Sequence, residues 1–182
     1  MISEEPIQYG KARRAIERLG LNPLLAQLLE SIKKCKVLIR KEKEGNGAGE
    51  IADKLVGTLR KLKGWREGKT SEGEPDFIAC IEHNAAQVCL GVEIQISARS
   101  VQVYQDVVHL RTAIRDRKID VGVIVINSDE FAYYLPSRVA NLREAQRYIE
   151  ETIDPRDLPL LVIPIKHDGF QTEAVPKRRT RH

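Results

Sequence analysis

The chain has 182 residues, of which 42% are hydrophobic and 31% charged, and it carries a formal net charge of +4. A chain of this length can bury a substantial core, and we expect one domain over residues 1–176 and a basic, flexible tail over residues 177–182. No apolar run approaches the ~18 residues of a membrane helix, and the first residues lack the apolar core of a signal peptide. We therefore expect a cytoplasmic protein.

Apolar residues at helical spacing predict three helices in the first third of the chain. The first covers residues 11–20. The second begins with Asn22 as its N-cap and Pro23 at the first helical position, which is a strong start signal. The third begins near Ala48 and ends at Gly64.

The remainder of the chain alternates between predicted strands and helices. In order, these are a β-hairpin within residues 74–100, a helix over about 101–117, a strand over 119–127, a helix over about 137–151 and a strand over 158–168. Pro159 and Pro164 place the last strand near a sheet edge. Because strand, helix and strand follow one another, we expect parallel pairing beside the antiparallel hairpin, in an α/β fold with a mixed sheet flanked by helices.

The hairpin sequence EPDFIACIEHNAAQVCLGVEIQISARS sets polar residues among core-forming neighbours. With Asn84 and Ala85 as a two-residue turn, Asp76 lies directly opposite Glu93. Directly opposed Cβ atoms are about 4.5–5.5 Å apart, and Gln95 points to the same face as Glu93. The other face of the strand carries an apolar row for the core: Val88, Leu90, Val92, Ile94 and Ile96.

Two facing carboxylates repel each other unless a cation lies between them. Mg²⁺ relieves this repulsion and prefers oxygen ligands, and such an ion polarises phosphoryl oxygens and acidifies bound water. Asp76 and Glu93 are therefore candidate metal ligands. The same pattern is also typical of two solvated carboxylates on a sheet face, so spacing alone leaves both interpretations open.

The order of these motifs is similar to that of a known nuclease family. The PD of Pro75-Asp76, followed by the EIQ of residues 93–95, resembles the PD-(D/E)xK nuclease signature with Gln95 in the place of the usual lysine. That replacement is a feature of BamHI/BglII-type restriction endonucleases. The helix VYQDVVHLRTAIRDRK and the strand segment IDVGVIVINSDE are also similar to the helix and strand that come after the catalytic hairpin in that group, so the resemblance covers about residues 74–130.

The resemblance implies a restriction-endonuclease-like fold and a homodimeric type II enzyme that cleaves double-stranded DNA with Mg²⁺ and leaves 5′-phosphates. It implies that Asp76, Glu93 and the backbone carbonyl of Ile94 bind the metal, and that Gln95 positions the attacking water. An amide does not titrate, so Gln95 cannot be the base. Members of this group also place an acidic or amide residue on a helix before the hairpin, and Glu50 is the first candidate, with Asp53 as the second.

Relatives read DNA bases with residues that come directly after the two central strands. The corresponding positions here are Ser97, Arg99, Ser100, Asn127, Ser128 and Asp129. Arg99 has the geometry for a bidentate contact with guanine, and Asn127 for one with adenine.

Two other functions stay open at this point. One is a nuclease for DNA repair or junction resolution, which recognises structure instead of sequence. The other is a protein of nuclease fold that binds DNA or a partner without cutting, and the replacement of lysine by Gln95 keeps this alternative open.

The hairpin also carries Cys80 and Cys89, which face each other in the expected register. A structural zinc site normally needs four ligands, and no fourth is evident beside these two and His83. We interpret the pair as reduced, partly buried thiols, with a cross-strand disulfide as the alternative. His109, on the following helix, is interpreted as a surface or interface residue and not as a catalyst.

Overall fold

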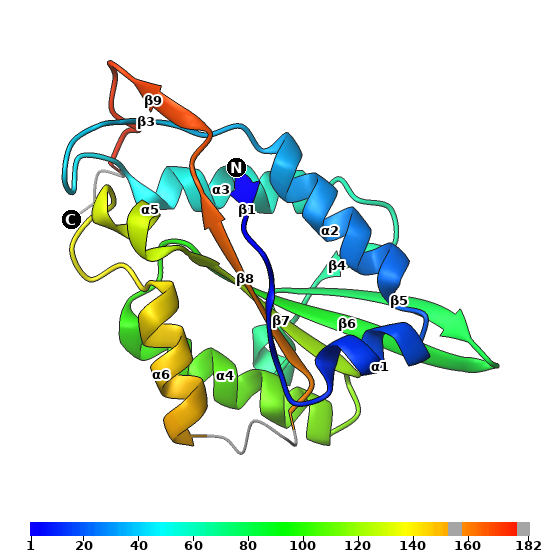
Figure 1. Cartoon of the computed structure of the whole chain (residues 1–182). Helices are drawn as coiled ribbons and strands as arrows, with labels where there is room; N and C mark the ends of the chain where they lie inside the picture. The colour runs from blue at the N-terminus through cyan, green and yellow to red at the C-terminus, as the bar shows by residue number, and fades with distance from the viewer. Residues whose placement is uncertain (153–157, 178–182) are drawn as a thin grey trace.

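A computed structural model describes residues 1–152 and 158–177 of the chain. Its centre is a mixed seven-stranded sheet with the strand order β1-β8-β7-β6-β5-β4, in which β2 also pairs with β8 (Figure 1). The strands are β1 (Ile2–Ser3), β2 (Ile7–Tyr9), β4 (Trp65–Glu67), β5 (Phe77–His83), β6 (Ala86–Gln95), β7 (Val121–Asn127) and β8 (Leu160–Lys166). Because β6, β7 and β8 run parallel and the outer pairs are antiparallel, the expected mixed sheet is confirmed.

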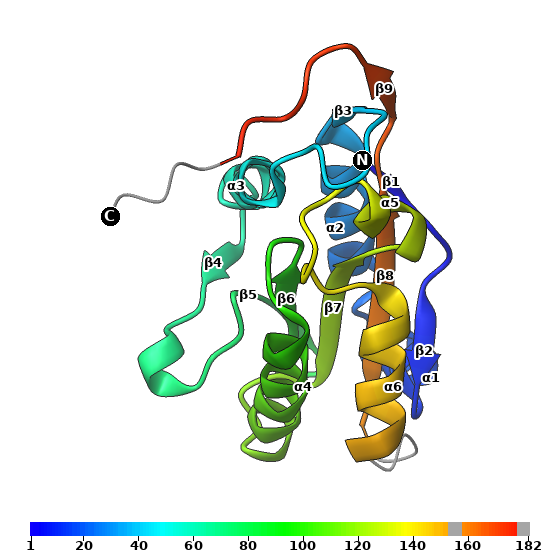
Figure 2. The same cartoon turned by 90° about the vertical axis from the view of Figure 1, so that its left-hand side faces the viewer.

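Helices cover both faces of this sheet. They are α1 (Ala12–Arg18), α2 (Asn22–Lys34), α3 (Ala48–Leu59), α4 (Ser100–Arg115), α5 (Asp129–Tyr133) and α6 (Leu142–Thr152), with a 3₁₀ turn η1 at Thr70–Glu72. Figure 2 shows α4 and α6 side by side in front of the strands, with α2 behind the strands. A small parallel sheet of β3 (Leu38–Arg40) and β9 (Gly169–Gln171) lies apart from the main one.

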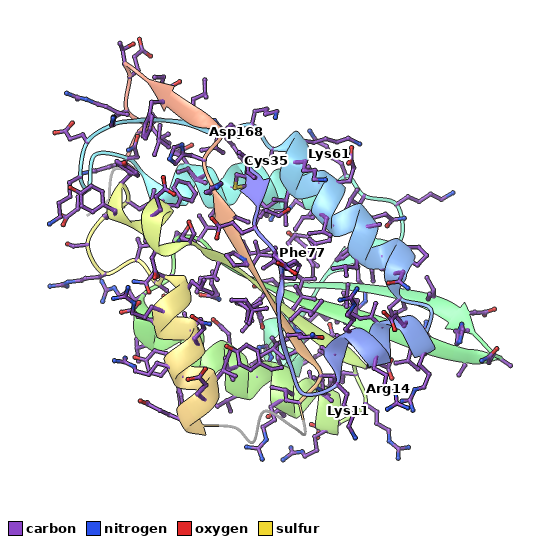
Figure 3. All side chains as sticks on the ribbon, in the orientation of Figure 1. Lys11, Arg14, Cys35, Lys61, Phe77 and Asp168 are labelled. Atoms are coloured by element: carbon purple, nitrogen blue, oxygen red, sulfur yellow. A yellow bond between two sulfur atoms is a disulfide. The ribbon has the colours of Figure 1, made fainter. Side chains whose placement is uncertain are left out.

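The two faces of the sheet bury separate apolar cores. One packs against α1, α2 and α3 and includes Phe77, which Figure 3 places in the interior of the molecule. The other packs against α4 and α6 and includes Ile78 and Val107. The apolar row of β6 lies in the first core, as expected. The opposite face is not reserved for polar groups, because α4 and α6 cover most of its length.

The hairpin register agrees with the sequence prediction. His83 pairs with Ala86 across the turn, and at the far end Phe77 pairs with Val92. Asn84 and Ala85 have φ values of 50° and 61°, which is the conformation that a tight two-residue hairpin turn requires. The next position beyond Phe77 and Val92 brings Asp76 beside Glu93.

Strand β8 lies one position in from the edge of the sheet, which agrees with the expected place near an edge, although β8 is paired on both sides. It pairs with β7 on one side and with β1 and β2 on the other. Pro164 is tolerated because the neighbouring segment is interrupted there: β1 pairs up to Ile165 and β2 begins opposite Val162. The carbonyl of Pro164 still accepts a hydrogen bond, at 2.8 Å from the N–H of Glu4.

Local predictions at three places need correction. Leu21, not Asn22, is the N-cap of α2, and no side-chain cap bond forms there. The helix expected over 137–151 begins at Leu142, and the short helix α5 precedes it. Cys80 and Cys89 form a disulfide, whereas two reduced thiols were expected. Their directly opposed positions, with Cα atoms 4.1 Å apart, permit that bond.

The part of the chain that is described contains no helix with both the length and the apolar character needed to cross a membrane. Of the basic tail expected over 177–182, residues 178–182 lie outside the described residues.

Candidate active site

Asp76 and Glu93 meet at the open end of the hairpin. Because Phe77 points into the core, the preceding Asp76 points to the opposite face, where Glu93 also lies. The Asp76 N–H donates to Oε2 of Glu93 at 3.3 Å, and the Ile94 N–H donates to Oδ2 of Asp76 at 2.9 Å. The two carboxylates predicted to face each other are therefore neighbours.

The loop before β5 holds Asp76 in place. Pro75 packs on Gly91 of β6, where an added Cβ would come within 2.8 Å of the proline ring. Both terminal nitrogens of Arg66 donate to Glu74, each at 2.7 Å. These hydrogen bonds lower the pKa of Glu74 to about 2. The residue two places before Asp76 is thus fixed as a carboxylate in a forked ion pair.

The carboxylates border a cavity of about 440 Å³, here called the acidic cavity. Its lining combines acidic, amide and small side chains: Asp76, Glu93, Ile94, Gln95, Ser97, Ala98, Gln102, Gln105 and Asp106. Glu93 and Gln95 are buried, with 3% and 5% of their surfaces exposed, whereas Asp76 is exposed. The cavity therefore joins buried polar groups of β6 to solvent.

His109 is partly exposed and is also a neighbour of the site, a contact that the sequence interpretation did not include. Its Nδ1 lies 2.9 Å from Oε1 of Glu93. Burial raises the pKa of Glu93 to about 7, and the hydrogen bond from His109 opposes that rise. The same bond raises the pKa of His109, because it favours the protonated ring. His109 thus holds Glu93 in one orientation.

Asp106 is the second site residue that the sequence interpretation missed. Burial, and next the charge of Asp76, raise the pKa of Asp106 to about 7. Asp106 and His109 are three residues apart and so share one side of α4. A pair of titratable residues at this spacing, on the helix that directly follows the strand with Glu93 and Gln95, was the available signal.

The donor set suits a hard divalent cation. Residues with carboxylate and amide side chains line the acidic cavity, and Gln95 Oε1 and Asp106 Oδ2 are buried with no hydrogen-bond partner. Among the described residues, no three His, Cys, Asp or Glu side chains already lie close enough to hold a metal together. Asp76 and Glu93 each direct a carboxylate oxygen toward a backbone N–H, so a cation held by three side chains would require these side chains to turn.

A second cavity, of about 320 Å³, adjoins the first at Ser97 and is here called the cationic cavity. Three segments meet around it, supplying Gly47, Ala48 and Gly49 at the start of α3, Ser97 and Arg99 after β6, and Pro136, Ser137, Arg138 and Val139 before α6, together with Lys177. The Ala140 N–H donates to the Ala98 carbonyl at 2.9 Å and joins two of these segments. Arg99, Arg138 and Lys177 are all exposed, so their charges are available to an anion.

The residues expected to read bases occupy different environments. Ser97 and Arg99 are exposed at the cationic cavity, whereas Asn127 is fully buried. Its Nδ2 donates to the carbonyls of Ile96 at 2.9 Å and Ala140 at 3.1 Å. We therefore assign Asn127 a structural role in place of the expected base contact.

Some of the remaining candidates also make contacts that stabilise the fold. Ser128 is buried and accepts a bond from the Phe131 N–H at the start of α5, and Asp129 pairs with Arg143. Ser100 begins α4, and its side chain lies outside the described part of the structure. Glu50 is half-buried in the first turn of α3 and is not among the residues that line the acidic cavity.

Comparison with known proteins gives one family. The model of the family described as restriction endonuclease BamHI matches residues 13–178, a range that contains every residue lining the two cavities. No curated protein matches the chain.

Proposed function

The chain belongs to the restriction endonuclease BamHI family, and from this premise we propose that it is a type II restriction endonuclease. It hydrolyses phosphodiester bonds at a specific site in double-stranded DNA, requires Mg²⁺, leaves 5′-phosphates and acts in the cytoplasm. The observation that carries the proposal is the contact between Asp76 and Glu93 at the mouth of the acidic cavity.

Each residue of the site has a distinct part in this proposal. Asp76, Glu93 and the Ile94 carbonyl would hold Mg²⁺, which, when bound, polarises the phosphoryl oxygen and acidifies water. The free Oε1 of Gln95 accepts a hydrogen bond from the attacking water and orients it. Gln95 takes no proton, because an amide does not titrate. His109 keeps Oε1 of Glu93 in place and is a positioning residue.

Digestion of phage and plasmid DNA tests the proposal. With Mg²⁺ we expect discrete, reproducible fragments, and with EDTA intact DNA. Cutting confined to branched or damaged duplexes would instead identify a junction or repair nuclease. Folded protein that binds DNA but cuts no substrate with Mg²⁺ would exclude both enzymes and leave the non-cleaving alternative.

We assign the cationic cavity to the DNA backbone, with Arg138 as a phosphate contact. We expect Arg138→Ala to weaken duplex binding about 10-fold at low salt, equally for all sequences, and to reduce the salt slope by about 1, because one counterion fewer is released. Titrations of labelled duplex in EDTA at several salt concentrations measure both the affinity and its salt dependence. Arg14→Ala removes an exposed arginine on α1, which Figure 3 shows pointing outward elsewhere on the molecule. Equal losses for the two variants would rule out this assignment.

The homodimer is supported by an apolar stripe on α4. Val101, Tyr104 and Val108 are 59%, 42% and 37% exposed and recur at helical spacing. A second copy covering this stripe would remove it from water. We expect sedimentation equilibrium to give twice the chain mass of 20.6 kDa. Tyr104→Glu should give the single mass, and Lys33→Glu, at an exposed position of α2 on the other face of the sheet, should not. If Tyr104→Glu still gives twice the chain mass, the interface lies elsewhere on the molecule.

A further inference from the structure

Asp106 reaches the acidic cavity from a different element than the predicted ligands. Asp76 and Glu93 come from the hairpin, whereas Asp106 lies in the second turn of α4, the helix that comes after β6. Val103, Val107 and Leu110 are fully buried against the sheet, which fixes the rotation of α4 about its axis. With that rotation, Asp106 and His109 both face the catalytic end of β6.

Two buried oxygen atoms at this cavity have no hydrogen-bond donor beside them. Asp106 Oδ2 and Gln95 Oε1 are buried and accept no hydrogen bond, and Gln95 as a whole is 5% exposed. Buried acceptors without a partner are rare, because each one costs the free energy of its lost hydration. Gln95 and Asp106 line the same cavity as Asp76 and Glu93. The acidic cavity therefore lacks a cation or hydrogen-bond donors that would satisfy these oxygens.

We propose that Asp106 is the third carboxylate ligand of the Mg²⁺ site, so that the additional acidic ligand comes from α4 and not from Glu50 on α3. This inference rests on the proposed function. It is consistent with the lining of the acidic cavity, which includes Asp106 and does not include Glu50. It also agrees with the charges of the lining: Gln95 stands in place of a lysine, so the described residues that line the acidic cavity include no ammonium group to compete with the cation for the three carboxylates.

Metal binding measured without catalysis tests the inference. Mn²⁺ is titrated into the whole chain by calorimetry, without DNA and with a short duplex that the protein does not cut, for the unaltered protein and for Asp106→Asn, Glu93→Gln and Glu50→Gln. We expect Asp106→Asn to weaken Mn²⁺ binding about 10-fold or more, as Glu93→Gln does, and Glu50→Gln to change it by less than about 2-fold. Glu82→Gln, an exposed position on the same hairpin, is the matched control. Far-UV circular dichroism and thermal unfolding verify that each variant is folded.

The outcomes separate this inference from the proposed function. If Asp106→Asn binds Mn²⁺ like the unaltered chain while that chain still cuts DNA with Mg²⁺, only the inference fails. A loss with Glu50→Gln that equals or exceeds the loss with Asp106→Asn assigns the ligand to α3 and likewise overturns it. If the unaltered chain binds no Mn²⁺, free or with DNA, and cuts nothing, the proposed function fails and the inference falls with it.

Discussion

Replacing Asp76 by Asn or Glu93 by Gln is expected to lower the Mg²⁺-dependent rate of DNA cleavage on the order of 1,000-fold or more. Each substitution keeps the shape of the side chain and removes a charge from the proposed Mg²⁺ site, where a bound cation would stabilise the transition state by several kcal/mol. Single-turnover cleavage of a duplex that contains the recognition site measures the rate of the chemical step.

Duplex binding in EDTA distinguishes a catalytic role from a role in DNA binding. Both variants should bind as tightly as the unaltered chain or more tightly, because each removes a negative charge that repels phosphates. Glu82→Gln makes the same chemical change at an exposed position of β5 and should cut at the unaltered rate. Cleavage by Asp76→Asn or Glu93→Gln within about 10-fold of that rate would show that the chemistry occurs elsewhere.

The largest expected loss of stability comes from Asn46, which is fully buried. Its Oδ1 accepts from the N–H groups of Arg40 and Val175, and its Nδ2 donates to the carbonyls of Arg40 and Tyr134. Asn46→Ala leaves the N–H groups of Arg40 and Val175 without this acceptor, at about 1–3 kcal/mol for each that stays dry. The two carbonyls keep other bonds, from the N–H of Glu42 to Arg40 and from the main-chain N–H of residue 46 to Tyr134. We expect the free energy of unfolding, measured by urea titration, to fall by about 3 kcal/mol.

Asn22→Ala is the matched control for Asn46→Ala, because Asn22 is exposed and makes no cap bond at the start of α2. Its effect should stay within about 0.5 kcal/mol. A loss below about 1 kcal/mol for Asn46→Ala would mean that water replaces the lost amide. Asn46 also matters for the cationic cavity, because its bond to Val175 holds the segment that carries Lys177.

The hairpin shows which part of the site is predictable from sequence. A two-residue turn and strict alternation of apolar residues leave one register, since a shift by one residue would turn the whole apolar row toward the other face. That register placed Asp76 beside Glu93 and Gln95 on the same face as Glu93. The parallel pairing of β6, β7 and β8 was predictable for a similar reason, because strands joined by helices pair in parallel.

Side chains that meet across elements were not predictable in this way. Helical periodicity marks the buried side of α4, but it does not say which strand end lies under Asp106 and His109. Asn127 has the sequence context of a base-reading residue, yet the carbonyls of Ile96 and Ala140 converge on its amide once the elements pack. The pairing of β8 on both sides likewise depends on the break between β1 and β2, which are distant from Pro164 in sequence.

The local pattern of the chain is therefore sufficient to pair Asp76 with Glu93, because both the turn and the alternation act within a few residues. Asp106, His109 and the two arginines of the cationic cavity join the site only through the docking of α4 and of the loop before α6. Docking depends on the shapes of buried faces from distant parts of the chain, and a linear pattern does not contain that information.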